Sequence, residues 1–178
     1  MSQLSKADAE LAFRYLPERV QADVEYAAYN ATMTSWSEDR PDDLAKLEEA
    51  ADDADSPFDW ANLELSFERS QVDGRDELVP HTMTGDADSE VHELARDFAW
   101  DYVAAVRDEV CALQEETNFS PREFVAFVLS ESQLSWEAAA SEMDIASGTF
   151  ASKMQREVKP EIEAAERTVA FVQQFGEQ

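Results

Sequence analysis

A long stretch in the middle of the chain carries apolar residues in the pattern of an amphipathic helix. Between Ser89 and about Glu116 they recur at steps of three and four, at Val91, Leu94, Phe98, Tyr102, Val106, Val110 and Leu113. These steps place side chains on one face of an α-helix. The pattern predicts one helix over residues 88–118, on the order of 40 Å long. A helix of this kind is usually the spine of a domain or the seam of a dimer.

The residues before this helix predict a small helical domain, residues 1–87. An Ala-rich and aromatic-rich pattern from Lys6 to Trp36 predicts two helices, and Pro17 suits the first position of the second. Pro41 then opens a short acidic helix. We therefore expect mainly helical structure up to about residue 52.

The same N-terminal domain is predicted to carry a β-hairpin within residues 62–84. From Leu63 to Phe67 apolar and polar residues alternate, which is the period of a half-buried strand. Asp73-Gly74 follows as a turn signal. Glu77 to Thr84 returns as a second strand, which Pro80 restricts to the edge of a sheet.

The C-terminal segment, residues 119–178, begins with the signature of a capped helix. Ser120 is the expected cap, Pro121 suits the first helical position, and Glu123 can reach back to the cap. Phe119 is expected to pack on Phe124. The helix is predicted to run to about Ser132.

Two further helices are predicted to be joined by a tight turn. The first runs from Trp136 to Met143, with Ser135 as its cap and a break at Asp144-Ile145. The second begins near Ser147 and ends at Lys159, because Pro160 disfavours helical geometry in the residue before it. A short helix, a tight turn and a second helix form a helix-turn-helix.

The sequence SWEAAASEMDIASGTFASKM, from Ser135 to Met154, resembles the helix-turn-helix of region four of bacterial sigma factors and of the related response-regulator DNA-binding domains. The resemblance extends over 119–159. It implies that Ala140 lies where the two helices touch, that Ile145 follows the turn, and that Phe150 and Met154 face inward. It also implies that two pairs of residues approach DNA: Gly148 with Thr149, and Ser152 with Lys153.

The chain departs from the family pattern at three positions. Asp144 stands where the turn usually has Gly, although Asp tolerates a left-handed backbone better than most residues. Ala146 replaces a frequent capping residue, so that Ser147 is expected to cap the helix one residue later. Ala151 replaces a residue that is often basic. These departures bear on how DNA bases would be read more than on the fold.

The spacing of residues along the last helix supports the resemblance independently. At about 100° per residue, Phe150, Met154 and Val158 lie on one face and are predicted to be buried. The opposite arc carries no carboxylate, and Lys153 lies on its flank. The predicted DNA-binding residues are Gly148, Thr149, Ser152, Lys153, Gln155, Arg156, Lys159 and Arg122. Of these, Lys159 and Arg122 are expected to touch phosphates.

The excess of acidic residues indicates the salt concentration in which the protein works more than it indicates a binding partner. Forty Asp and Glu oppose 14 Lys and Arg, which gives a net charge of −26. Acids spread through every segment are typical of proteins from salt-accumulating halophiles. We expect a soluble, cytoplasmic protein with no membrane span. In molar salt, phosphate contacts lose most of their strength, so DNA binding is expected to need base contacts and two subunits.

Two segments are open as the seam of the expected homodimer. One is the helix over residues 88–118. The other follows Pro160, where Ile162, Ala165, Val169 and Val172 repeat at three, four and three residues, on a helix that ends near Phe175-Gly176. It is equally open that this second helix simply packs on its own domain.

Several function classes are excluded by residue counts. One cysteine, two histidines and four scattered glycines provide no disulfide scaffold, zinc site, Cys-His protease or phosphate-binding loop. We therefore expect no enzyme, no metal and no cofactor. The sequence predicts a mostly α protein that regulates transcription by binding double-stranded DNA. The alternative is an adaptor that uses the same C-terminal domain to bind another protein of a transcription complex.

Overall fold

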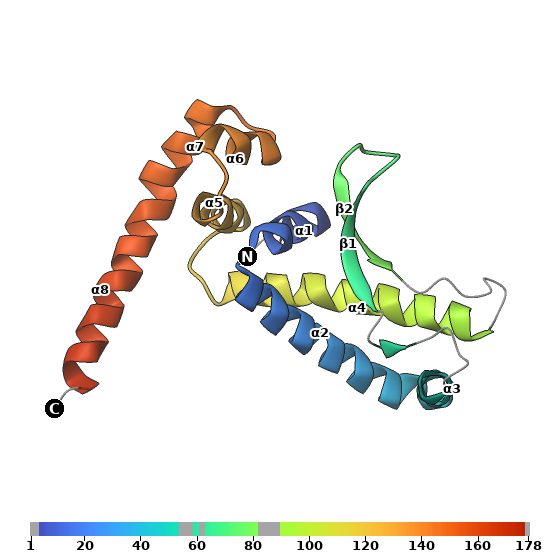
Figure 1. Ribbon diagram of the computed structural model, residues 1–178. Coiled ribbons are helices and arrows are strands. Elements are labelled where there is room, and N and C mark those ends of the chain that lie inside the picture. The colour runs from blue at the N-terminus through green and yellow to red at the C-terminus, as the bar shows by residue number, and fades with distance from the viewer. Residues whose placement is uncertain (1–3, 54–58, 61–62, 82–89, 177–178) are drawn as a thin grey trace. The chain divides into compact units, whose positions relative to one another are not determined.

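The computed structural model describes residues 4–53, 59–60, 63–81 and 90–176. It is mostly helical with one small antiparallel sheet, which confirms the predicted mostly α class (Figure 1). Its elements are α1 Lys6–Tyr15, α2 Glu18–Asp39, α3 Pro41–Asp52, β1 Glu64–Arg69, β2 Asp76–His81, α4 Glu90–Glu115, α5 Pro121–Glu131, α6 Trp136–Glu142, α7 Ser147–Lys153, the π-helical turn η2 Met154–Val158, and α8 Lys159–Gly176. No helix within these ranges has both the length and the apolar character needed to cross a membrane.

The chain folds into two compact units. One contains residues 1–18 and 110–178, and the other contains residues 19–109. These units do not coincide with the predicted segments 1–87, 88–118 and 119–178. The difference arises because α1 packs against α5, where it buries Ala9, Ala12 and Phe13. The apolar pattern predicted that each helix forms, but not which distant segment packs against its apolar face.

The unit of residues 19–109 is organised around α4, the predicted long helix. Leu94, Phe98, Tyr102 and Val106 are buried along its apolar face. The ring of Phe98 meets Trp36 edge-on at 5.1 Å between centroids, and Trp60 at the same distance. Such edge-to-face pairs add to the stabilisation from burial alone. This face of α4 is therefore the spine of its own core.

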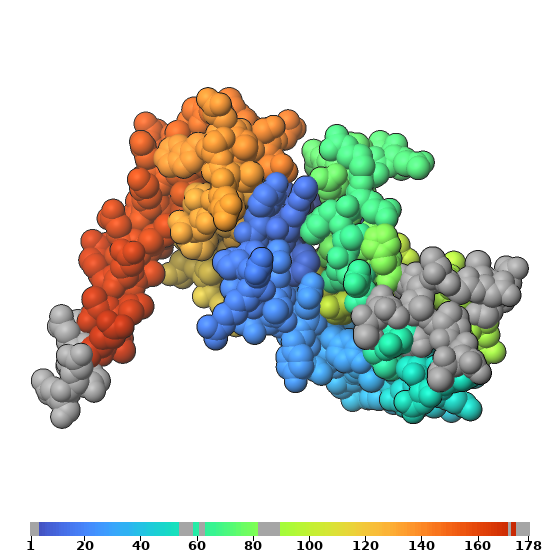
Figure 2. Space-filling view, in the orientation of Figure 1, coloured from blue at the N-terminus to red at the C-terminus, as the bar shows by residue number. Residues whose placement is uncertain are grey.

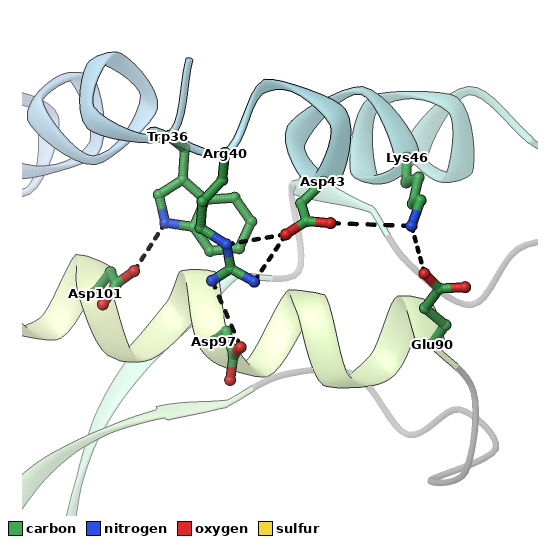
Figure 3. A network of polar contacts seen from close by, with 7 residues as sticks. All are labelled: Trp36, Arg40, Asp43, Lys46, Glu90, Asp97 and Asp101. Atoms are coloured by element: carbon green, nitrogen blue, oxygen red, sulfur yellow. Dashed lines mark hydrogen bonds and ion pairs between the residues drawn. The ribbon is translucent and has the colours of Figure 1, made fainter. Parts of the chain in front are cut away.

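A network of polar contacts fastens α2 and α3 to α4 (Figure 3). Trp36 donates its indole N–H to Asp101 at 2.8 Å, which satisfies a buried donor. Arg40 stacks on the Trp36 ring at 4.2 Å and pairs with Asp43 at 3.0 Å and Asp97 at 3.5 Å. Lys46 pairs with Glu90. The network joins neighbouring helices, so we assign it a structural role.

The predicted hairpin is present as β1 and β2. The strands pair in antiparallel register from Glu64 with His81 to Arg69 with Asp76. Gly74 in the connecting turn has φ +63°, a backbone conformation that Gly adopts without strain. Leu78 is 1% exposed and anchors the hairpin. Of the predicted range 62–84, residue 62 and residues 82–84 lie outside the described part of the chain.

Candidate nucleic-acid interface

The turn between α6 and α7 is closed by backbone hydrogen bonds. Ser135 caps α6 by accepting from the N–H of Ala138 at 3.2 Å. At the other end Ile145 donates to the carbonyl of Ala140 at 3.0 Å, and Asp144 donates to that of Ser141 at 3.1 Å. This pair of bonds is a Schellman motif, which needs one left-handed residue. Asp144 supplies it with φ 55°, as the sequence predicted.

The start of α7 differs from the prediction. Ala146 is the cap residue, with extended backbone and no side-chain hydrogen bond, and Ser147 is already helical. The expectation that Ser147 caps the helix is therefore wrong. The Schellman motif takes the chain to Ile145, so a single extended residue separates that motif from the helix. The Ala146 carbonyl accepts from Thr149 and Phe150 and closes the first turn.

The predicted end of this helix at Lys159 is also wrong. The helix passes from α7 through η2 directly into α8, and Lys159 keeps helical angles, φ −57° and ψ −44°. Pro160 cannot donate to a carbonyl four residues earlier because it has no N–H. In η2 the Lys159 N–H donates to Met154, five residues earlier. This wider turn ends directly before the proline, and the helix continues through Pro160 without a break.

The inward face of the α7–η2 segment is packed as predicted. Phe150 and Val158 are 0% exposed and Met154 is 3% exposed. They share the unit's core with Ala139 and Ala140 of α6 and with Met143 at its C-terminal cap, which are all buried. Trp136 meets Phe150 edge-on at 6.0 Å. The orientation of this helix about its axis is thus fixed by buried apolar side chains.

The remaining predicted contacts divide by exposure. Five lie on the exposed surface of the segment, namely Gly148, Thr149, Gln155, Arg156 and Lys159, whereas Ser152 and Lys153 are half-buried. Among the described residues, no acidic side chain lies within ion-pair distance of Arg156 or Lys159. The exposed face therefore offers two uncompensated cations, small hydroxyl and amide groups, and one glycine.

Lys153 is engaged by its own protein. Its side chain is 22% exposed and forms an ion pair with Glu157, one turn further along the helix. Lys153 is also close to Glu123 of α5. The pKa of Glu123 is lowered first by a hydrogen bond from Ser120, while burial opposes this, and the charge of Lys153 lowers it further. The charge of Lys153 is thus partly compensated within the protein.

Arg122, which was predicted to touch a phosphate, is directed toward the end of α6. Its guanidinium lies 3.5 Å from the carbonyl oxygen of Met143 and 3.8 Å from Asp8 of α1. A cation at a helix C-terminus interacts favourably with the carbonyls that have no partner there. Arg122 therefore links α1, α5 and the turn.

Replacing Arg122 with glutamine tests this assignment. The half-exposed side chain and its marginal contacts suggest a loss of about 0.5 kcal/mol in stability. If Arg122 acts on the turn, the slope of log affinity for DNA against log salt stays unchanged. Thermal unfolding and binding titrations at several KCl concentrations measure the two quantities. A slope that becomes shallower by about 0.9 would instead identify Arg122 as a phosphate contact.

Two other polar arrangements do not form a reactive site. No group of three or more potential metal ligands exists within the described residues. On the hairpin, His81 Nε2 contacts Ser66 Oγ and lies 3.5 Å from Glu68. Because both partners approach the same ring nitrogen, the histidine cannot relay a proton from the serine to the carboxylate.

A groove in the unit of residues 1–18 and 110–178 was not predicted. It has a volume of about 610 Å³ and lies between α8 and the connection from α4 to α5. Phe119 and Phe127 form part of its wall, with ring centroids 5.3 Å apart. Phe119 thus packs on Phe127, one helical turn beyond the expected Phe124, which is itself buried.

The candidate interface is thus one helical face whose orientation is set by a buried core. Comparison of the chain with protein-family models, with curated proteins and with solved structures found no match.

Proposed function

We propose that this protein is a sequence-specific DNA-binding regulator of transcription, in which α6 and α7 form a helix-turn-helix and α7–η2 enters the major groove. The observation that carries the proposal is the contrast between the two faces of α7–η2. One face is fully packed, and the other is exposed, with Arg156 and Lys159 free of acidic partners among the described residues. The resemblance of residues 135–154 to sigma-factor region four supports the same function.

The exposed residues and the half-buried Ser152 each have a chemical role in this proposal. Arg156 can donate two parallel hydrogen bonds to a guanine or a phosphate, and Gln155 can pair with an adenine. The Thr149 and Ser152 hydroxyls suit either contact, and Lys159 suits a phosphate. Lys153 is paired with Glu157 of the same segment, whereas Arg122 contacts Asp8 of α1 and the end of α6.

The charge of the chain sets how binding would work. With a net charge of −26, the protein as a whole is repelled by DNA in dilute salt. In molar salt the repulsion is screened, but phosphate contacts are weakened as well. Base contacts and two subunits on neighbouring half-sites are then needed for useful affinity. We therefore propose a homodimer that works at high salt.

Selection from a random pool of duplexes tests the proposal. The wild-type chain is expected to enrich a common sequence with two half-sites in molar KCl. The enriched duplex should then shift the protein in a gel, whereas a scrambled duplex of the same composition should not. If no duplex is retained at any salt concentration, the DNA-binding proposal fails.

One observation favours a second candidate, the adaptor that binds a protein of the transcription machinery. Of the three basic residues on or beside α7–η2, Lys153 is already paired with Glu157, which leaves only Arg156 and Lys159. Two cations are few for a DNA-binding face but would suffice for a contact with a protein. An adaptor would use the same exposed face without retaining any duplex. The selection experiment therefore separates the two candidates.

Gly148 provides a prediction in which stability and binding change in opposite directions. A Cβ added at Gly148 meets nothing within 4 Å, so Gly148→Ala fits the fold. Alanine in a helix is expected to stabilise the protein by about 0.5–1 kcal/mol. If this turn of α7 lies against DNA, the added methyl group should weaken binding. Unfolding and DNA titrations of the same samples measure both effects, and unchanged binding would place the DNA elsewhere.

A further inference from the structure

The apolar face of α8 is left uncovered in the described part of the chain. Ile162, Ala165, Val169 and Val172 follow each other at three, four and three residues, which places them along one face of the helix. Val169 is 55% exposed and Val172 is 60% exposed. Figure 2 shows α8, in red, as a rod that projects from the orange residues before it. Most of the stability of a helix in a protein comes from the packing of its apolar face, and along α8 much of this face is exposed.

The groove described above runs beside this face. Ile162, Ala165 and Val169 form its α8 side, and Phe119 and Phe127 lie in its other wall. The apolar surface is therefore wider than one helix face. All of these residues belong to the unit of residues 1–18 and 110–178.

The other candidate seam is already used inside the protein. Along α4, Phe98 is 1% exposed, and Val106 and Val110 are 0% exposed. A seam must present its apolar side chains to the second subunit, so this face of α4 is not available. Of the two segments that the sequence left open, α8 alone presents such a face.

We infer that α8 and its groove form the interface between two copies of this chain. In an antiparallel arrangement with a two-fold axis near residue 167, Ile162 of each copy lies opposite Val172 of the other, and Ala165 lies opposite Val169. Every apolar residue of the stripe then meets an apolar partner, as a two-fold interface requires. The inference deepens the homodimer part of the proposed function by naming the surface that joins the copies.

The available area fits a weak dimer. An 18-residue helix is about 27 Å long and about 10 Å wide, so one face covers on the order of 300 Å². The groove wall beside it adds a smaller area in each copy. Two copies would then bury on the order of 800 Å² in total, which is the size of a weak or transient interface.

Charge predicts how this dimer responds to salt. Glu116, Glu161 and Glu166 line the groove together with the apolar residues, and no Lys or Arg among the described residues does. Two copies that each carry −26 repel one another in dilute salt. In molar salt the screening length falls to about 3 Å, and the apolar contact remains. The dimer should therefore tighten as salt rises, whereas a basic protein partner in the same groove would be released.

Light scattering and sedimentation of the full chain, without DNA, test the inference. In about 2 M KCl the wild type is expected at about 40 kDa, twice the 20.0 kDa of one chain. Val172→Glu should return the mass to that of one chain. Arg167→Gln makes the same change of charge on the opposite face of α8 and should remain dimeric. Circular dichroism checks that each variant keeps its helix content, and Val172→Ser, which adds no charge, should weaken the dimer in the same direction.

Three results would overturn the inference. The first is a wild type that has the mass of one chain at every salt concentration. The second is a dimer that survives both Val172→Glu and Val172→Ser, since another surface would then hold it. The third is a dimer that dissociates as salt rises, since opposite charges would then hold it. None of these results involves DNA, so failure here is distinct from failure of the DNA-binding proposal.

Discussion

Replacing Phe150 with alanine is expected to destabilise the unit of residues 1–18 and 110–178 by about 3–5 kcal/mol. Phe150 is 0% exposed and lies against Trp136 in the core that joins α6 to α7. Truncation removes the burial of an aromatic ring and leaves a cavity that the surrounding helices fill only in part. Such a loss is a large fraction of the stability of most domains.

Urea or thermal unfolding in molar salt measures this effect, with Thr149→Ala as the control. Thr149 is the neighbouring residue on the exposed face, and its truncation should change stability by less than about 0.5 kcal/mol. Because the chain has two compact units, the transition of this unit should be followed by the fluorescence of Trp136. A loss below about 1 kcal/mol for Phe150→Ala would contradict its place at the centre of this core.

The local elements of this chain were readable because each has its own signal in neighbouring residues. Ser120 and Glu123 form the predicted capping box, and Pro121 occupies the first turn of α5. Asp144 takes the predicted left-handed conformation. The two-residue alternation around Leu65 gave β1. In all three cases the information lies within a few residues of the element itself.

The features that were missed depend on residues far apart in the chain or on competition between rules. The packing of α1 on α5 joins segments more than one hundred residues apart, and no local pattern specifies it. Pro160 was expected to end a helix, but the helix continues through it. The π-helical turn before the proline changes the hydrogen-bond pattern there, since the Lys159 N–H donates to Met154. That outcome has a physical reason, because Val158 and Met154 are buried and hold the segment helical up to the proline.

The candidate site shows the same division. The helical period placed Phe150 inward and Arg156 outward, and both positions agree with the structure. The period could not show that Lys153 pairs with Glu157 or that Arg122 turns toward Asp8 and Met143. In a chain where acids outnumber bases almost threefold, a basic residue readily finds an internal partner. The cations without such a partner are therefore the informative ones.

Arg156 is the residue whose charge reversal is expected to cost the most DNA affinity. It is exposed on η2, and no acidic side chain in the described residues competes for it. A base or phosphate contact from such a residue is worth about 1–3 kcal/mol, so Arg156→Glu should weaken specific binding by about 5- to 150-fold. Folding should be unaffected, because the side chain does not contribute to the buried face.

Arg167→Glu is the matched control for this variant. It makes the same change of two charges on the exposed outer face of α8, outside the proposed groove contact. In molar KCl a purely long-range effect of charge is screened within about 3 Å, so this control should bind DNA like the wild type. If both variants lose affinity equally, the loss reflects net charge, and Arg156 does not contact DNA.

A comparison of neutral variants then tests the geometry itself. Arg156→Gln and Lys153→Gln each remove one positive charge from neighbouring turns of the same helix. Because Lys153 is paired with Glu157, its loss should weaken binding less than the loss of Arg156. Glu157→Gln should release Lys153 and strengthen binding in dilute salt, where the freed charge is least screened. Titrations of all three variants at several KCl concentrations give this order, and a reversed order would mean that Lys153, not Arg156, faces the duplex.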